Sequence, residues 1–450
     1  MITAASPLHI TTVGVHLESG SSLVNLLPHL VPSGVWIREG RGLIGLGTAA
    51  ATAASGHSRF AQLSRWWESL PLVEDADPLS TASTSSAQLN SPPTSSAPTG
   101  VGPGPVAFTS ITYSADSEHA SALIVPELLI SSTEEGVWLT AVAPEGAALA
   151  DLLSAHGLQL HGSVLSLSRP APAQPLPPAE QQPGSQSQRH YLDAVAAGLG
   201  AIDEGEVEKL VLARDVLVRA ADPLPVGPLL SRLAADYADC WTYLVSDVLG
   251  ATPEMLVSVR GEEVFSRVLA GTVDHDMQVQ QAHDGLLRDL KQHREHELAV
   301  LSLLDQLSPV TQSLSSPAEP RVLELPNVYH LATDITGRLK RGDDGELPPA
   351  LLVAKHAHPT AAVCGTPTPQ ADQLLASLEG LDRGPFAGPV GWIDTRGNAD
   401  FGIALRGGVL EDESTVRLYA GCGVVAGSEP ESELAETRSK LRVMLTALGA

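Results

Sequence analysis

The stretch Glu208-Lys-Leu-Val-Leu-Ala-Arg214 places a lysine directly before a run of apolar residues. A run of this kind is typical of a buried β-strand, so we expect a strand over residues 207–220. A lysine at the start of that strand would have a partly desolvated ammonium group, and burial lowers a lysine pKa toward the value that a general base needs. Taken alone, however, Lys209 is better described as a strand-end lysine that faces water.

Two further motifs follow, Thr252-Pro-Glu254 and Leu269-Ala-Gly-Thr272. Glu254 stands between a proline and an apolar strand pattern, where a carboxyl group held in a cleft has a raised pKa and can donate a proton. Gly271 and Thr272 offer backbone N–H groups and a hydroxyl that suit a carboxylate ligand. The alternative for both motifs is an ordinary turn.

Acidic residues occupy one face of the last predicted helix, over residues 431–448. Glu433, Glu436 and Lys440 are spaced i, i+3 and i+7, so they share that face. Glu295 lies on the polar face of another predicted helix, over residues 283–307. Two helices that each supply a carboxylate can hold Mg²⁺. The alternative is a solvated helix face on which Glu436 pairs with Lys440.

A small glycine motif and one arginine complete the candidates. Gly421-Cys-Gly423 lies between a predicted strand and the last helix, where glycines let an anion approach backbone N–H groups. Arg406, at the end of a predicted strand, has the fork geometry that clamps a carboxylate. Together the residues predict an α/β enzyme or binding protein for a small anion, either with or without a divalent cation.

The amino-acid composition makes some classes of binding partner unfavourable. The 450 residues include 27 Lys and Arg against 52 Asp and Glu, a net charge of −25, which disfavours nucleic acid or an anionic membrane as a partner. The N-terminus lacks the charged start of a signal peptide, and no apolar run reaches the roughly 18 residues of a membrane span. We therefore expect a cytoplasmic protein with three reduced cysteines. The sequence has no coiled-coil seam, which favours a monomer or a weak homo-oligomer.

The chain divides into two halves. Residues 1–170 form the expected N-terminal half, with a low-complexity insertion at 77–104, and residues 171–188 read as a Pro/Gln-rich linker before a catalytic region at 189–450. Within the first half, the Ala-rich segment 49–70 predicts a helix. Strands and helices alternate without an internal repeat, which indicates one large α/β body.

From about residue 188 to the C-terminus the chain resembles the chorismate-utilising enzymes that feed menaquinone, siderophore and tryptophan synthesis, most closely the isochorismate synthases. The motifs that carry the resemblance stand in the family's order: Lys209-Leu-Val-Leu-Ala-Arg214, Thr252-Pro-Glu254, Leu269-Ala-Gly-Thr272, Glu295-His296, His358-Pro-Thr-Ala-Ala-Val-Cys-Gly365, Gly388-Pro-Val-Gly-Trp392, Ala404-Leu-Arg406, Ala420-Gly-Cys-Gly-Val424, Ser428-x-Pro430 and Glu433-x-x-Glu436-x-x-x-Lys440. The N-terminal half matches only loosely.

The resemblance implies a fold and a set of roles. The fold is a single large α/β (α+β) domain of two stacked, mostly antiparallel sheets flanked by helices. Lys209 would activate water for attack at C2 of chorismate, and Glu254 would protonate the departing C4 hydroxyl. The remaining residues would bind Mg²⁺ (Glu295 and Glu436 directly, Glu433 through water) or the substrate (Gly271, Thr272, His330, Ala362, Arg406, Gly421 and Lys440).

The nucleophile and the later steps separate the members of this family. Lys209 favours water over ammonia, since anthranilate synthases lack a lysine base at that position. Ala362 and Phe386 stand where salicylate synthases tend to have threonine and tyrosine, which favours stopping at isochorismate. The alternatives are a salicylate synthase, an amidotransferase-coupled anthranilate or aminodeoxychorismate synthase, and a catalytically silent chorismate-binding protein. Thr252 replaces the usual serine, and Cys422 the usual alanine.

Overall fold

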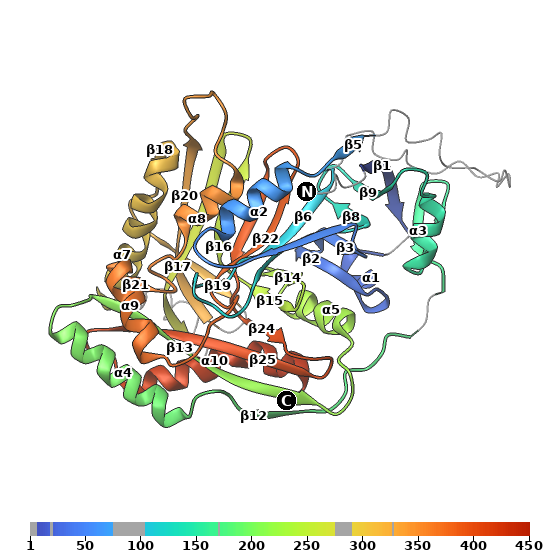
Figure 1. The fold of residues 1–450 in the computed structure, drawn as a ribbon. Coiled ribbons are helices and arrows are strands. Elements are labelled where there is room, and N and C mark those ends of the chain that lie inside the picture. Colours follow the sequence, from blue (N-terminus) through green and yellow to red (C-terminus); the bar gives the residue numbers. More distant parts are fainter. Residues whose placement is uncertain (1–6, 19–20, 75–103, 170–171, 275–289, 326–327) are drawn as a thin grey trace.

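The computed structural model describes residues 7–18, 21–74, 104–169, 172–274, 290–325 and 328–450. Across these ranges two large β-sheets lie against each other, and helices cover their outer faces (Figure 1). The strand pairs are antiparallel except for the two pairs that β1 makes with β5 and β11. The prediction of two stacked, mostly antiparallel sheets in one domain is therefore confirmed.

The first sheet has 15 strands in the described ranges and mixes both halves of the sequence. It contains β1 (Leu8–Leu17), β2 (Pro32–Arg38), β3 (Arg41–Leu46), β5 (Leu72–Glu74), β8 (Leu128–Ser132), β9 (Val137–Pro144), β10 (Leu158–His161), β11 (Val164–Leu167), β12 (Ala179–Pro183), β13 (Lys209–Ala220), β14 (Trp241–Val245), β15 (Val248–Thr252), β21 (Gly365–Thr366), β24 (Gly407–Leu410) and β25 (Thr415–Val425). Since β2 pairs with β14, the N-terminal half and the C-terminal half share one sheet.

The second sheet has 10 strands in the described ranges. These are β4 (Ala50–Ala54), β6 (Val106–Ser110), β7 (Ser121–Val125), β16 (Met255–Arg260), β17 (Glu263–Asp274), β18 (Thr311–Ser315), β19 (Arg321–Leu325), β20 (Val328–Leu339), β22 (Pro389–Asp394) and β23 (Ala399–Ile403). Here too the halves meet, because β6 pairs with β22.

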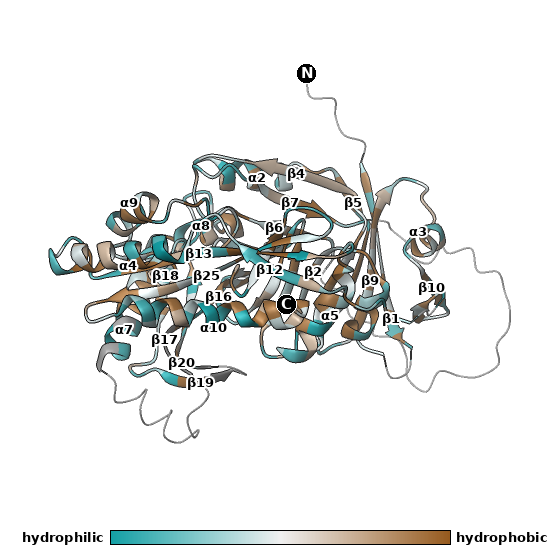
Figure 2. Cartoon of the chain, turned by 90° about the horizontal axis from the view of Figure 1, so that it is seen from below, coloured by the Kyte–Doolittle hydropathy of each residue, from teal (hydrophilic) through white to brown (hydrophobic). Residues whose placement is uncertain are grey.

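Helices cover both sheets: α1 (Leu23–Leu26), α2 (Arg59–Glu68), α3 (Leu149–Ala155), α4 (Gln188–Asp203), α5 (Val226–Asp236), α7 (Leu290–Leu307), α8 (Ala350–Ala357), α9 (Thr368–Leu378) and α10 (Pro430–Leu448), with short 3₁₀ turns at Leu27–His29 and Ser308–Val310. In Figure 2 the hydrophobic colour concentrates in the central strands and the hydrophilic colour on peripheral helices such as α4. This is the pattern expected when one face of each helix is buried against a sheet. None of the described helices is long and apolar enough to cross a membrane.

Aromatic side chains fill part of the space between the sheets. Trp36 and Tyr243 come from the first sheet and Phe108 and Trp392 from the second, and all four are buried. Gly34 in β2 makes this packing possible, because a Cβ there would lie 2.3 Å from Phe108 Cδ2. Aromatic side chains bury large apolar areas, so this cluster ties the two sheets together.

The structure corrects one element of the sequence reading and confirms others. The helix expected over 49–70 is wrong in its first part, because residues 50–54 form β4, which pairs with β7, and only Arg59–Glu68 is helical. Alanine favours a helix in isolation, but strand pairing at a sheet edge outweighs that propensity. The strand over 207–220 and the last helix are confirmed as β13 and α10.

Two expected segments lie wholly or partly outside the described ranges. The insertion at 77–104 is one, apart from its last residue, and the first part of the helix expected over 283–307 is the other. From Leu290 onward that helix is present as α7. Residues 179–183, inside the expected linker, form β12 at the edge of the first sheet.

Candidate active site

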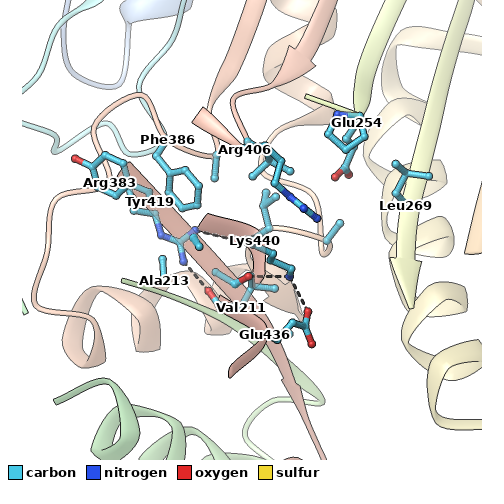
Figure 3. Close-up of a pocket in the computed structure, with 18 of the residues that line it drawn as sticks. Val211, Ala213, Glu254, Leu269, Arg383, Phe386, Arg406, Tyr419, Glu436 and Lys440 are labelled. Atoms are coloured by element: carbon cyan, nitrogen blue, oxygen red, sulfur yellow. Dashed lines mark hydrogen bonds and ion pairs between the residues drawn. The ribbon is translucent and has the colours of Figure 1, made fainter. Parts of the chain in front are cut away.

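A pocket of about 120 Å³ opens between the two sheets (Figure 3). Its lining comes from strands of both sheets, from α7 and α10, and from the connections between them: Val211, Ala213, Pro253, Glu254, Leu269, Gln292, Ala362, Val363, Arg383, Phe386, Ala387, Leu405, Arg406, Tyr419, Ala420, Gly421, Gly423, Glu433, Glu436 and Lys440. Glu254 and Leu269 stand on one side of it and Arg383 and Phe386 on the other. Charged groups of both signs therefore converge on a partly apolar cavity, as in many ligand sites.

Lys209 is the first residue of β13 and is only 1 % exposed. Its backbone pairs with Val425 of β25 and with Thr366 of β21. Side chains two residues apart point to the same face of a strand, and Val211 and Ala213 both line the pocket. Lys209 therefore lies on the pocket face of β13, and the alternative of a water-facing lysine is excluded.

Glu254 and Arg406 lie where the chain passes from one sheet to the other. Thr252 ends β15 in the first sheet and Met255 begins β16 in the second, so Pro253 and Glu254 form the crossing. Residues 404–406 make the reverse crossing, from β23 to β24. The two crossings are tied by hydrogen bonds from the Ile403 N–H to the Glu254 carbonyl (3.1 Å) and from the Ala251 N–H to the Arg406 carbonyl (3.2 Å).

This location explains the burial of Glu254, which is 6 % exposed. The Glu254 N–H donates to Thr252 Oγ1 at 3.3 Å, so the threonine hydroxyl at this position helps to hold the turn. Burial raises the pKa of Glu254 to about 8, although the positive charges of Lys209, Lys440 and Arg406 act in the opposite direction. A carboxyl group with that pKa is protonated at neutral pH and can serve as a general acid.

The raised pKa predicts a pH-dependent cost in stability. Glu254 releases its proton near pH 4.5 when unfolded but only at about pH 8 when folded. As pH rises between these values the unfolded state loses a proton that the folded state keeps, so unfolding becomes more favourable. The full cost, on the order of 5 kcal/mol, is present above about pH 8 and absent below about pH 4.

Glu254→Gln removes this ionisation while keeping the side chain's shape. We expect the melting temperature of the variant, relative to wild type, to rise between about pH 5 and about pH 8.5. Thermal unfolding followed by circular dichroism at both pH values measures the difference. Glu319→Gln, at an exposed position, is the control. A difference between Glu254→Gln and wild type that does not change with pH would contradict the assignment of a raised pKa.

Lys440 and Glu436 form a second polar group in the pocket. Lys440 Nζ donates to the Gly421 carbonyl at 2.8 Å and lies 2.8 Å from Glu436 Oε1. Burial is the largest single effect and acts to lower the pKa of Lys440, but the charge and hydrogen bond of Glu436 together with Cys422 outweigh it, and the net shift is upward. Lys440 is therefore held as a cation, and the expected ion pair on this helix face is present inside the pocket.

Glu433 and Glu436 also belong to a cluster that suits a metal ion. Ligand atoms of Cys422, Glu433 and Glu436 all lie within 4.8 Å of one another. Glu433 is 6 % exposed, and its Oε2 accepts a hydrogen bond from the Cys422 thiol at 2.7 Å. A carboxylate has about four lone-pair sites, so this bond leaves acceptor capacity on Glu433. Two carboxylates at a pocket wall fit Mg²⁺, which prefers oxygen ligands.

The remaining predicted positions fall into two groups. Ala362 and Gly421 line the pocket, as does Arg406, whose backbone is left-handed with φ at 49°. Gly271 and Thr272 lie in β17, where Thr272 pairs with His330 of β20, and Glu295 lies in α7. The side chains of Thr272, His330 and Glu295 and the surroundings of Gly271 are outside the described part of the chain, so their predicted roles stay predictions.

The sequence motifs did not predict that two further residues, Arg383 and Tyr419, line the pocket. Arg383 is 4 % exposed, and Tyr419 stacks on Phe386 with ring centroids 5.1 Å apart. Tyr419 lies in an apolar strand pattern that resembles any other buried strand. Arg383 precedes the Gly388 motif in a Gly/Pro-rich loop, where an arginine is usually on the surface. Neither local sequence pattern marks Arg383 or Tyr419 as a residue of the site.

Comparison with known proteins agrees with this geometry. Residues 37–449 match the family described as chorismate binding enzyme. The chain is 36% identical over 273 residues to isochorismate synthase DhbC and 33% identical over 266 residues to isochorismate synthase MenF, both of Bacillus subtilis (strain 168). Each alignment covers 58% of this chain, and the alignments cover 67% and 55% of the two relatives.

A solved structure has the same fold. The menaquinone-specific isochorismate synthase MenF of Escherichia coli superposes with a TM-score of 0.73 at 22% identity, over 99% of this chain and 95% of that one. The fold, the pocket between its sheets and a family match that spans most of the sequence agree, and the chain belongs to the chorismate binding enzyme family.

Proposed function

We propose that this protein is an isochorismate synthase, which isomerises chorismate to isochorismate with menaquinone or a siderophore as the destination of the product. The observation that carries the proposal is Glu254, a buried carboxyl group in the pocket with a pKa of about 8. Loss of the C4 hydroxyl needs a proton donor at neutral pH, and Glu254 is held in the protonated form. Relatives at 33% to 36% identity that are named isochorismate synthases support the same reaction.

Lys209 and Glu254 divide the proton transfers between them. Lys209 takes a proton from the water that attacks C2, and Glu254 gives a proton to the hydroxyl that leaves C4 as the double bonds shift. The groups come from different parts of the fold, since Lys209 begins β13 in the first sheet and Glu254 lies in the crossing that leads to β16 of the second sheet. A pocket between the sheets can therefore present a base and an acid to one ring.

The substrate has two carboxylates, and the pocket has cations to receive them. Arg406 and the backbone at Gly421 bind the enolpyruvyl carboxylate in this proposal, with Lys440 beside them. Burial lowers the pKa of Arg406, and the nearby acidic groups act in the opposite direction. A partly desolvated guanidinium gains more from a carboxylate partner than an exposed one does.

Glu295 and Glu436 would hold Mg²⁺ directly in this proposal and Glu433 through a water molecule, and the bound ion would supply positive charge next to the ring carboxylate. The support is the pair of carboxylates at the pocket wall, with lone pairs of Glu433 left over after its bond to Cys422. Within the described part of the chain, Glu436 is also paired with Lys440, so that cation positions the Glu436 carboxylate.

The deciding experiment is to incubate the purified protein with chorismate and Mg²⁺ and to separate the products by chromatography. Isochorismate as the main product is the expected result. Salicylate plus pyruvate would show a salicylate synthase instead, and Ala362 and Phe386 are the residues that argue against it. Aminated products at high ammonium would show the ammonia-using reaction. Chorismate binding with no product would show a silent binding protein.

Metal removal is a separate prediction. Treatment with EDTA should abolish turnover, and added Mg²⁺ should restore it. Glu436→Gln should weaken Mg²⁺ binding, measured by isothermal titration calorimetry, by about tenfold or more, because it removes one charged oxygen ligand. Glu431→Gln, an exposed position on the same helix, is the matched control. Equal Mg²⁺ affinity in Glu436→Gln and wild type would remove Glu436 from the metal site.

A further inference from the structure

The edge of β13 next to the pocket lacks a continuous partner strand in the described structure. On one side β13 pairs with β25 along most of its length. On the other side β21 pairs only with Lys209 and Leu210, and β12 begins to pair at Val216. The Val211 N–H reaches the Cys364 carbonyl at 2.8 Å, which extends the β21 side by one bond. Beyond this bond, the backbone N–H and C=O groups of β13 that lie between β21 and β12 need other hydrogen-bond partners.

A buried ion pair supplies those partners. Arg383 donates from Nη2 to the Val211 carbonyl at 2.6 Å, and the Ala213 N–H donates to Glu379 Oε1 at 2.7 Å. Arg383 also donates from Nε to Glu379 Oε2 at 2.8 Å, and a second bond joins Nη2 to Oε1. Both side chains are 4 % exposed. The pair therefore continues the hydrogen bonding of the sheet edge with side-chain atoms, between two short strands.

The same arginine also bonds the loop that leads into β21. Arg383 Nη1 donates to the Val363 carbonyl at 2.8 Å, one residue after Ala362. The Arg383 guanidinium carbon lies 4.4 Å from the centre of the Tyr113 ring, and the Tyr113 N–H donates to the Gly384 carbonyl at 2.8 Å. The guanidinium thus joins the strand that begins at Lys209 to the loop that carries Ala362.

We propose that the Glu379–Arg383 pair is a positioning element for the reaction: it holds the Lys209 end of β13 at a set distance from the Ala362 loop, so that base and substrate meet in one geometry. Val211 and Ala213 are two and four residues after Lys209. Because side-chain direction in a strand repeats every two residues, all three residues have the same orientation in β13. A displacement of about 1 Å in catalytic geometry can cost about 10²-fold in rate.

A lysine cannot replace this arginine. The planar guanidinium places several N–H donors in a fixed fork, and here they serve two carbonyls and one carboxylate at once. A lysine ammonium keeps the charge opposite Glu379 but cannot reach both the Val211 and Val363 carbonyls in the same geometry. Arg383→Lys therefore separates the positioning bonds from the charge.

The first test compares Arg383→Lys with wild type and with Arg189→Lys, an arginine whose side chain is 80% exposed. In Arg383→Lys we expect kcat for isochorismate formation to fall by about 10²-fold with KM changed by less than about threefold. Assays are run well below the melting temperature of each variant. Wild-type kcat in Arg383→Lys would overturn the proposal.

The second test is chemical rescue of Arg383→Ala. Arg383 lines the pocket, so guanidinium from solution can enter the space that the substitution leaves. Millimolar guanidinium should raise kcat severalfold while the folded fraction, followed by tryptophan fluorescence, stays constant. Sodium chloride and urea at equal concentration are the controls. Recovery of activity in proportion to a recovered folded fraction would show a purely structural role.

The proposal rests on the proposed function for its kinetic readout, so a third measurement is independent of turnover. Hydrogen exchange followed by mass spectrometry should show faster exchange of the amides of residues 209–213 in Arg383→Lys, with the β24 amides unchanged. If wild type forms no isochorismate, the proposed function fails and exchange still tests the positioning element. Unchanged exchange at 209–213 would overturn the positioning role even in an active enzyme.

Discussion

Lys209→Ala is expected to abolish isochorismate formation while chorismate binding persists. Lys209 lies at the start of β13 on the pocket face and is 1 % exposed, so bulk water has no access to replace its amino group as the base. General-base catalysis contributes about 10²–10⁴-fold to the rate, and we expect a loss in that range or larger. Product formation by chromatography and chorismate affinity by calorimetry are the two measurements.

Two further variants make the Lys209 result specific. Lys209→Met fills the buried space with a side chain of similar length, so it distinguishes loss of the base from a cavity in the core. Lys355→Ala, on the exposed side of α8, controls for loss of a lysine in general. If Lys209→Met retains more than about a tenth of wild-type kcat, Lys209 is not the base, because the loss would be too small for general-base catalysis.

Glu254→Gln is expected to lower kcat by about 10²–10⁴-fold, because glutamine occupies the same space but cannot protonate the departing hydroxyl. The variant should remain folded, since the buried side chain is already neutral at pH 7 in wild type. Glu254 acts on the far side of the pocket from β13, in the crossing between β15 and β16. Product formation at pH 7 measures the effect.

The pH dependence of wild type gives a second, stronger test of the same residue. A general acid works only while it is protonated, so kcat/KM should fall as pH rises above about 8, through the pKa of Glu254. The residual activity of Glu254→Gln should lack this alkaline limb. If the alkaline limb persists unchanged in Glu254→Gln, another group is the acid.

Much of the site could be predicted from residue patterns. The period of α10 placed Glu433, Glu436 and Lys440 on one face, and the structure has all three in the pocket wall. The apolar run after Lys209 predicted β13, and the Thr-Pro-Glu motif predicted a carboxyl beside a strand. These are local properties, because helix period, strand composition and turn chemistry depend on neighbours within a few residues.

Other features depend on contacts between distant residues. The sequence Ala50–Ala54 predicts a helix because alanine favours helices. Pairing with β7, about 70 residues later, makes this segment a strand instead. The bonds between Ala213 and Glu379 and between Val211 and Arg383 join residues separated by 166 and 172 positions. No local pattern marked Glu379 or Arg383 as partners of β13.

The sequence by itself determined which chemical groups the protein has: a lysine at the head of an apolar strand, a glutamate in a turn and two carboxylates on one helix face. The tertiary structure decided what those groups can do. Lys209 and Glu254 are buried because β13 lies inside one sheet and residues 253–254 cross to the other. Burial raises the pKa of Glu254, and burial arises only when two sheets pack, which no stretch of sequence encodes alone.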